Sequence, residues 1–220
     1  MKKKIIGIVF ITFFTLNSFA QEPWLPSLSF GYSMSDVLNY NDAFKTTFRP
    51  SFNVGLDFQM FRIAPRTYLT TDIYYQRLGT KINSEGYNFK VKNDYVQFSL
   101  KPRFYFIEES FWDGPPGYYF DLGPYASYLL KSRQDGTALG MEYDNINTID
   151  FYETLDYGIS ASIGVAILQS LFFELNYNYG LSEINSGGGN NHFFSLNLML
   201  SSMFFEVLFT KPDYNEGFED

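Results

Sequence analysis

Six charged residues are the strongest candidates for chemistry, because each lies on the polar side of a segment in which polar and apolar residues alternate. A charge removed from water is costly unless a partner neutralises it. We therefore expect the two cations to bridge carboxylates on neighbouring segments and so to hold those segments together. The alternative chemistry is a path for protons or ions along the same groups. The six residues are Asp57, Asp72, Lys101, Arg103, Asp121 and Glu174.

The chain has a single histidine, His192, so a hydrolase with a serine nucleophile and a histidine base would have to use it. Ser195 follows three residues later and therefore falls on the opposite side of an extended segment. Ser182 would have to approach His192 across a loop. We expect a histidine at a loop edge, predict no catalytic residue, and predict that the chain is not an enzyme.

Carboxylates are dense in the segment Glu142–Asp156, and oxygen ligands at such density can bind Ca²⁺. The segment lacks the spacing and the central glycine of an EF-hand, so we expect a solvated acidic loop. The chain has no cysteine, which excludes metal sites built from thiolates. We therefore predict no metal site and no cofactor.

An alternation with period two organises the whole chain. In residues 172–182, Phe, Leu and Tyr fall on one side of an extended strand, and Glu, Asn and Gly fall on the other. The pattern recurs about eight times and predicts strands with one apolar and one polar side. Pro102 lacks a hydrogen-bond donor, so we expect a bulge there. The expected strands are Ser27–Ser35, Ser51–Phe61, Tyr68–Leu78, Tyr95–Phe106, Tyr118–Leu130, Tyr157–Ile167, Phe172–Ser182 and a last strand that begins near His192.

The connections between these strands alternate between long and short. Barrels of the bacterial outer membrane have short periplasmic turns and long outer loops, and an even number of strands leaves both termini in the periplasm. We therefore predict an all-β fold, a transmembrane up-and-down antiparallel β-barrel of about eight strands with both termini periplasmic. The polar side would then face a side-chain-filled lumen. The long connections, expected to be loops, are Asp36–Arg49, Gly79–Asp94, Lys131–Asp156 and Ser182–Asn191.

Aromatic residues make up 20 % of the chain, and outer-membrane barrels place them in girdles at both membrane interfaces. We expect Tyr32, Tyr118 and Tyr119 to be such interface anchors. Two alternatives stay open. Residues 158–175 are apolar enough for a transmembrane helix, although their small residues recur with period two. A soluble sandwich or lipocalin-like barrel would show the same alternation with the faces exchanged, although an eight-strand interior could hardly hold so many rings.

The first twenty residues have the composition of a secretory signal peptide: Lys2–Lys4, an apolar core at Ile5–Phe14, and Ser18-Phe19-Ala20 before the cleavage point. We expect the barrel to span residues 21–210 and a short acidic tail to span 211–220. Three of the 16 basic residues lie in the leader, so its removal changes the net charge from −8 to −11. Such a chain is not expected to bind nucleic acid.

Several stretches resemble the PorT-like family of small outer-membrane β-barrels, also called porin family or outer membrane protein β-barrel domain proteins. They are the leader end Ser18–Gln21, the strand starts Phe30-Gly31-Tyr32 and Asp121–Tyr125, and the closing hairpin. The resemblance implies insertion by the outer-membrane machinery and, for some members, links to secretion and gliding apparatus. Such barrels usually end on an aromatic residue, whereas this chain continues to Asp220. Phe205 or Phe209 would have to end the last strand.

Three functions remain open at this point: a structural or interaction role at the envelope, an accessory role in a secretion or gliding machinery, and a narrow channel. We favour the first, with a filled lumen. The partners expected are outer-membrane lipid and lipopolysaccharide, the insertion machinery and, in the second case, an envelope protein complex. Divalent cations bridging the acidic segment to lipopolysaccharide phosphates are a further alternative.

Overall fold

The computed structural model describes residues 25–38, 45–84, 86–106, 117–168, 171–184 and 188–201. The expected signal peptide, the acidic tail and the aromatic end of the last strand lie outside these residues. The described chain forms ten strands and one short 3-10 helix, η2 (Ile149–Phe151). The strands are β1 Leu25–Leu38, β2 Lys45–Ala64, β3 Thr67–Leu78, β4 Thr80–Ser84, β5 Tyr87–Tyr105, β6 Gly117–Ala138, β7 Met141–Asn147, β8 Leu155–Leu168, β9 Leu171–Gly180 and β10 Asn190–Ser201.

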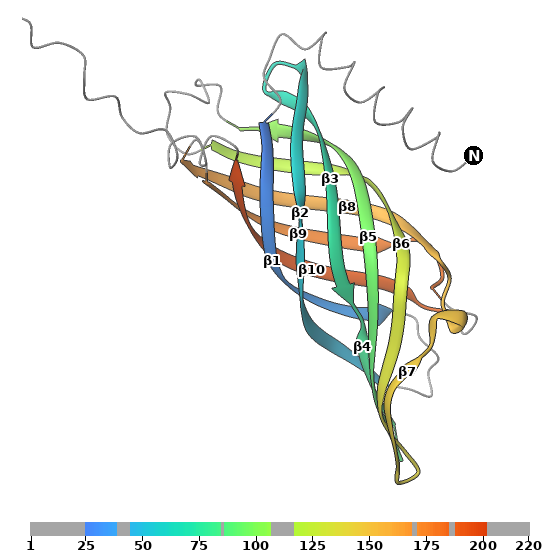
Figure 1. The fold of residues 1–220 in the computed structure, drawn as a ribbon. Helices are drawn as coiled ribbons and strands as arrows, with labels where there is room; N and C mark the ends of the chain where they lie inside the picture. Colours follow the sequence, from blue (N-terminus) through green and yellow to red (C-terminus); the bar gives the residue numbers. More distant parts are fainter. Residues whose placement is uncertain are drawn as a thin grey trace, which may run out of the picture.

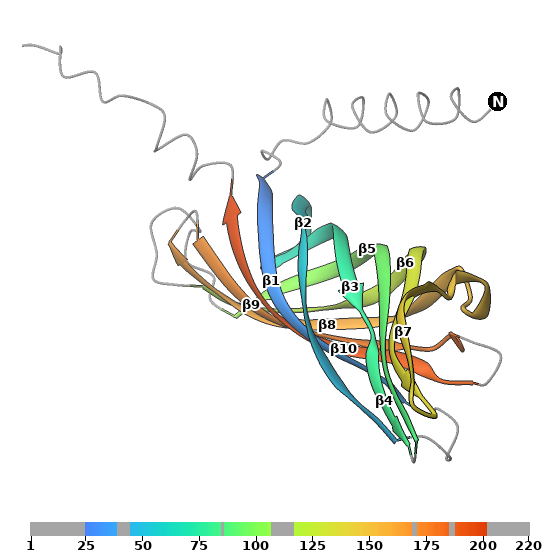
Figure 2. The ribbon, with the colours of Figure 1, turned by 60° about the horizontal axis from the view of Figure 1, so that its bottom comes forward.

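Eight of these strands close into a ring in the order β1, β2, β3, β5, β6, β8, β9, β10 (Figure 1, Figure 2). Every neighbouring pair is antiparallel, and β10 returns to pair with β1 from Ser27↔Ser201 to Leu38↔Asn190. Closure gives each ring strand a partner on both sides, so the ring has no free edge. The prediction of an eight-strand up-and-down antiparallel barrel is confirmed.

The barrel has two distinct ends. At the turn end, β1 begins, β10 ends, and the short turn at Pro65–Arg66 joins β2 to β3. At the loop end, β4, the first part of β5, the last part of β6 and β7 extend the wall into a projecting sheet (Figure 1). The first strand of the ring therefore begins, and its last strand ends, at the end of the barrel opposite the projecting sheet.

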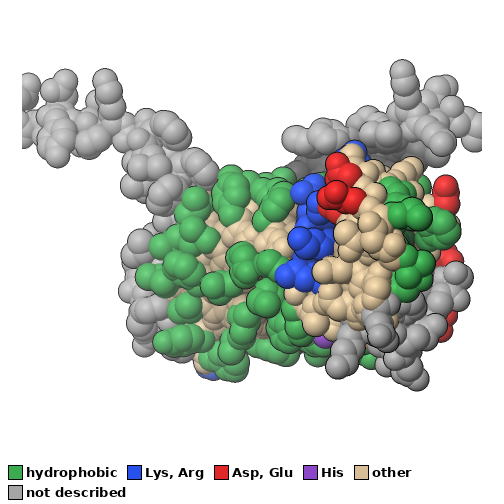
Figure 3. All heavy atoms as spheres, turned by 90° about the horizontal axis from the view of Figure 1, so that it is seen from below, with side chains coloured by type: hydrophobic (Ala, Val, Ile, Leu, Met, Phe, Trp, Pro, Cys, Tyr) green, Lys and Arg blue, Asp and Glu red, His purple; other side chains and the backbone are tan. Residues whose placement is uncertain are grey.

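Apolar side chains cover the outside of the ring, and most of the buried side chains inside it are polar. Figure 3 shows the hydrophobic surface on one face. The alternative of a soluble sandwich or lipocalin-like barrel, in which the apolar and aromatic side of each strand would face the interior, is therefore wrong. Exposed outer residues include Phe30, Tyr32, Phe98, Leu122, Ile163, Leu175 and Leu196, and buried inner ones include Ser29, Asn53, Thr70, Gln97, Ser160, Asn178 and Asn197.

Residues 158–168 belong to β8 and residues 171–175 to β9, so the interpretation as a transmembrane helix is also wrong. Within the described residues, no helix combines the length and the apolar character that crossing a membrane requires.

Three of the expected loops are shorter than predicted, because the strands continue beyond the alternating pattern. β2 begins at Lys45, residues 79–94 form the β4–β5 hairpin, and β6 runs to Ala138 before it pairs with β7. Beyond the hydrophobic band, both faces of a strand are in contact with water, so neither face needs apolar residues. The strands still pair through their backbone hydrogen bonds, but the alternating pattern is lost. At the joint between β3 and β4, a Cβ on Gly79 would lie 2.0 Å from the carbonyl oxygen of Val91, so only glycine fits.

The bulge expected at Pro102 is absent. The register between β3 and β5 is unbroken through Leu69↔Pro102, and the irregularity of β5 lies instead at Asp94/Tyr95. On the side of β6, the ladder stops after Ser99↔Tyr125 and resumes in the same register at Arg103↔Asp121. Pro102 and Pro124 both lack a donor in this stretch, so the strands stay aligned without being bonded there.

Candidate functional site

Arg103, on β5, is the centre of the charged cluster inside the barrel. Its side chain is 2 % exposed, and its Nη2 lies 2.8 Å from a carboxylate oxygen of Asp121 on β6. The same nitrogen lies 3.2 Å from Asp57 on β2 and 3.5 Å from Glu174 on β9. A planar guanidinium with several donors suits such a multiple contact better than a lysine would. One side chain thus connects four strands of the ring.

Lys101 carries the second cation, two residues earlier on the same face of β5. Its Nζ lies 2.7 Å from Asp72 on β3, 4.0 Å from Asp121, and 3.2 Å from the hydroxyl of Ser162. The hydroxyl of Ser99 donates to the same oxygen of Asp72, Oδ2, at 2.5 Å. The structure therefore brings all six charged residues singled out in the sequence into one network.

Strand register explains why these residues meet. Asp57 is directly opposite Asp72 in the β2–β3 ladder, and Arg103 is directly opposite Asp121 in the β5–β6 ladder. Residues two apart on a strand share a face, so Lys101 and Arg103 point to the same side. The inward-pointing charged residues of five strands therefore lie at the same height along the barrel axis, where they contact one another.

Tyr119, which sequence reasoning assigned to the membrane interface, belongs to this network instead. It is fully buried, its ring centre lies 4.2 Å from the guanidinium carbon of Arg103, and its hydroxyl donates to Glu174 at 3.2 Å. Gly164 makes room for the ring, because a Cβ there would lie 2.1 Å from it. The signal was present in the sequence, since Tyr119 is two residues before Asp121 and so shares its face. Tyr32 and Tyr118 do lie on the outside.

Two apolar clusters lie inside the ring on either side of the charged network. Towards the turn end, Tyr105 packs against a buried cluster of Tyr119, Ala166, Phe172 and Met199. Towards the loop end, Ile149 and Tyr152 pack against a buried cluster of Leu78, Tyr95, Leu129 and Phe193.

Between the network and the loop-end cluster lies a level of amide side chains. Gln76 donates to Gln97 at 2.6 Å, and Gln97 in turn donates to Asn178 at 3.3 Å. The cavity lined by these residues has a volume of about 10 Å³, which is the space of a single water molecule. Its lining includes Asn53 and Asn197, whose side-chain oxygens have no partner among the described residues.

The structure does not bring His192 and Ser182 together. The side chain of Asn191 points inward and donates to Asp156 at 3.0 Å, so the next residue, His192, points outward. Its ring packs against that of Phe48, and the two ring centres are 5.1 Å apart. The hydroxyl of Ser182 donates instead to Asp156, at 2.6 Å. The described residues therefore offer no serine–histidine pair at this position.

The acidic segment is not a single loop. Glu142 lies in β7, Asp150 lies in η2, and Asp156 points into the barrel from β8. Within the part of the chain that the structure describes, no group of three or more His, Cys, Asp or Glu residues could hold a metal ion.

Comparison with known proteins gives a family match. The family model described as "Outer membrane protein beta-barrel domain" matches residues 19–186. A search of curated proteins finds no match.

Three solved structures with a related shape are distant in sequence. Ail of Yersinia pestis, in complex with the heparin analogue sucrose octasulfate, is 12 % identical, with a TM-score of 0.44 over 82 % of this chain and 99 % of that one. OprG of Pseudomonas aeruginosa is 10 % identical, with a TM-score of 0.47 over 83 % and 95 %. Neisserial surface protein A is 15 % identical, with a TM-score of 0.44 over 80 % and 96 %.

Replacing Arg103 tests how much the network stabilises the barrel. Arg103→Leu leaves three buried carboxylates without their shared cation, and breaking a buried ion pair from one side typically costs about 3–5 kcal/mol. We expect the free energy of unfolding in urea, measured on the protein refolded into lipid vesicles, to fall by about this amount. Arg62→Leu, an exposed change near the turn end, should leave it within about 0.5 kcal/mol. Equal stability of Arg103→Leu and the unmodified protein would contradict a stabilising network.

Proposed function

The chain belongs to the outer membrane protein beta-barrel domain family, and on this premise we propose that it is a structural and interaction protein of the cell envelope whose lumen conducts no solute. The observation that carries this proposal is the filling of the barrel interior. The ring itself provides the anchor in the outer membrane, with its apolar outer side chains in contact with lipid.

Side chains fill the barrel at four levels, which supports a closed lumen. The charged network joins β2, β3, β5, β6 and β9 across the lumen, so its side chains meet in the middle of the cross-section. An apolar cluster lies on each side of it, and neither cluster offers an ion a polar path. The cavity at the amide level is smaller than a hydrated ion. An eight-strand ring is just wide enough for its side chains to fill, as here.

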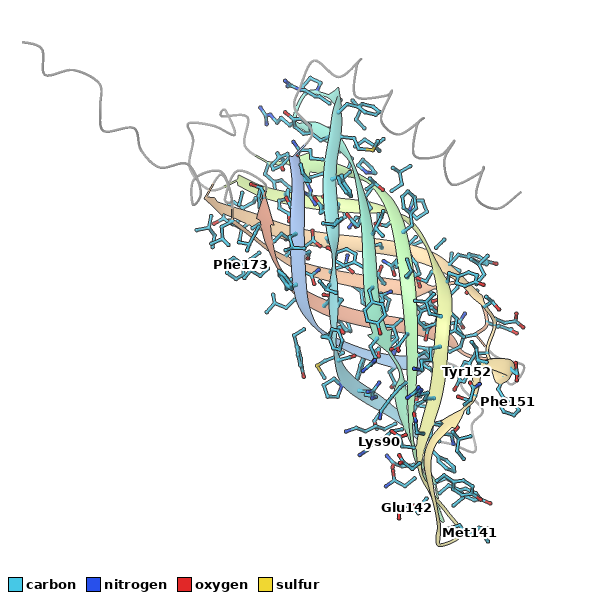
Figure 4. The ribbon with its side chains drawn as sticks, in the orientation of Figure 1. Lys90, Met141, Glu142, Phe151, Tyr152 and Phe173 are labelled. Carbon is cyan, nitrogen blue, oxygen red and sulfur yellow. The ribbon has the colours of Figure 1, made fainter. Side chains whose placement is uncertain are left out.

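The projecting sheet at the loop end supports the interaction role. At its tip, Leu139 and Met141 are 73 % and 65 % exposed, and Phe151 of the neighbouring η2 is 69 % exposed. Figure 4 shows Met141 and Glu142 at the tip of the sheet and Phe151 beside it. We take this exposed apolar tip as the surface that contacts a partner.

We propose that the turn end faces the periplasm, because the short turn between β2 and β3, the start of β1 and the end of β10 lie there. The projecting sheet then faces the exterior. The partners that go with this proposal are outer-membrane lipid, lipopolysaccharide and the insertion machinery. A second candidate, an accessory component of an envelope secretion or gliding machinery of the PorT-like kind, would use the same exposed apolar tip as its contact.

Planar-bilayer recording tests the closed lumen. Because the interior is filled, the purified protein should add no stepwise conductance to the bilayer at moderate voltages. A porin inserted under the same conditions is the positive control for detection. Reproducible unit steps that change in size when Asp72→Asn is introduced would show an ion path through the network, and the narrow channel would replace the proposal.

Labelling of intact cells tests the orientation. The chain has no cysteine, so Met141→Cys introduces the only thiol. We expect a membrane-impermeant maleimide to label Met141→Cys on intact cells, because the tip of the projecting sheet would face the exterior. Arg62→Cys, near the turn end, should be labelled only after the outer membrane is permeabilised. The reverse pattern would show that the barrel is inserted the other way.

A further inference from the structure

On the outside of β3, β5 and β6, the surface changes from apolar to cationic over a single step along the strands. Tyr75, Val96 and Tyr128 form the last apolar row of paired residues. The next outward row pairs Arg77 with Asp94 and Asp94 with Lys131, and the row after it pairs Lys92 with Arg133. Figure 3 shows Lys and Arg side chains gathered in one strip that borders the hydrophobic surface.

These cations face outward and not into the lumen. Their strand neighbours Gln76, Tyr95 and Ser132 are buried inside the barrel, at 2 %, 0 % and 0 % exposure. Alternation therefore points Arg77 and Arg133 to the outside, and the bulge at Asp94/Tyr95 keeps Lys131 beside them. The strip lies where the outer wall of the barrel leaves the hydrophobic band.

A pocket of about 140 Å³ opens within this strip. Its lining contains four cations and one carboxylate, and the sixth lining residue is Asn145 of β7. The residues are Arg77, Lys92, Asp94, Lys131, Arg133 and Asn145. A cavity of this size holds a phosphate group with part of its hydration.

Two of the four cations are already neutralised and two are not. Arg77 makes a forked ion pair with Asp94, at 2.6 Å and 3.2 Å, and Lys92 pairs with Asp135. Among the described residues, neither Lys131 nor Arg133 has a carboxylate within ion-pair distance. The pocket thus has a surplus of two positive charges, which matches the charge of a phosphate group at neutral pH.

The hairpin of β6 and β7 holds the pocket in shape. Nη1 of Arg133 donates to the side-chain oxygen of Asn145 at 2.6 Å, and the backbone N–H of Asn145 donates to Asp135 at 2.9 Å. Asn145 has a φ of 55°, a left-handed conformation that asparagine tolerates. The hydrogen bond from Lys92 lowers the pKa of Asp135, so this carboxylate stays charged and keeps both contacts at neutral pH.

We propose that this pocket binds a lipid A phosphate group in the leaflet that surrounds the loop end. The pocket begins in the row directly next to the last lipid-facing side chains, which places it at the level of the headgroups. It opens on the outer wall, so a phosphate tethered to a membrane lipid reaches it directly. The guanidinium of Arg133 suits the bidentate geometry of a phosphate, and Lys131 adds a mobile point charge. The choice of lipid A rests on the proposed orientation; the choice of phosphate does not.

Native mass spectrometry of the full chain in mild detergent tests the site. The probes are lipid A with both phosphates, dephosphorylated lipid A, phosphatidylglycerol and inorganic phosphate. The pocket variant is Lys131→Gln with Arg133→Gln, and the control is Arg62→Gln with Arg66→Gln, which removes the same charge near the turn end. Retained heat-dependent migration on a gel shows that each variant is folded.

We expect the pocket variant to bind phosphorylated lipid A about tenfold or more weakly, because two charge-assisted contacts are lost. The control variant should bind as the unmodified protein does, and dephosphorylated lipid A should bind weakly to all three. Equal affinity of the two variants would overturn the site. Equal binding of the two forms of lipid A would show that the pocket does not recognise the phosphate group. Tighter binding of phosphatidylglycerol or of inorganic phosphate would show that lipid A is not the source of the phosphate. The thiol-labelling pattern reports the orientation separately.

Discussion

The structure depends on one constraint: a charge that points into a closed barrel finds no bulk water and must find its counter-charge inside the ring. Arg103 meets this constraint from a single position on β5, because its guanidinium reaches carboxylates on β2, β6 and β9. Lys101 adds β3 through Asp72. Five strands of the ring are thereby joined at one level of the wall.

The other interior side chains fill the space around the charged network. Tyr119 covers the guanidinium of Arg103, and the missing side chain of Gly164 makes room for its ring. Apolar clusters occupy the lumen on both sides, so the barrel is filled rather than open. β5 illustrates how much one strand carries, because it supplies the two inner cations, the outer apolar residues Val96 and Phe98, and Lys92 of the outer phosphate pocket.

Period two in the sequence was sufficient to predict the fold and to identify the six charged residues that share the interior, because face alternation is a local property of a strand. Tyr119, which shares the face of Asp121, was nevertheless assigned to the outside. The pattern failed where the conformation at a position depends on the neighbouring strands. β6 continues past Leu130 to Ala138, and β5 begins at Tyr87 instead of Tyr95. Both faces of these extensions carry polar residues, so the alternating pattern does not reveal them. The proline at 102 caused no bulge, because β3 holds its register. The pocket at Lys131 and Arg133 depends on the pairing of β5, β6 and β7, which no single segment reveals.

The most direct test of this account is the chemical accessibility of two adjacent residues of β9. Leu175 is 51 % exposed on the outer face, and Asn176 is 6 % exposed on the inner face. In a chain without cysteine, Leu175→Cys and Asn176→Cys each carry one thiol that can react with a lipid-soluble maleimide in vesicles. The account predicts rapid reaction at position 175 and reaction at position 176 only after unfolding. Rapid reaction at 176 with protection at 175 would contradict it.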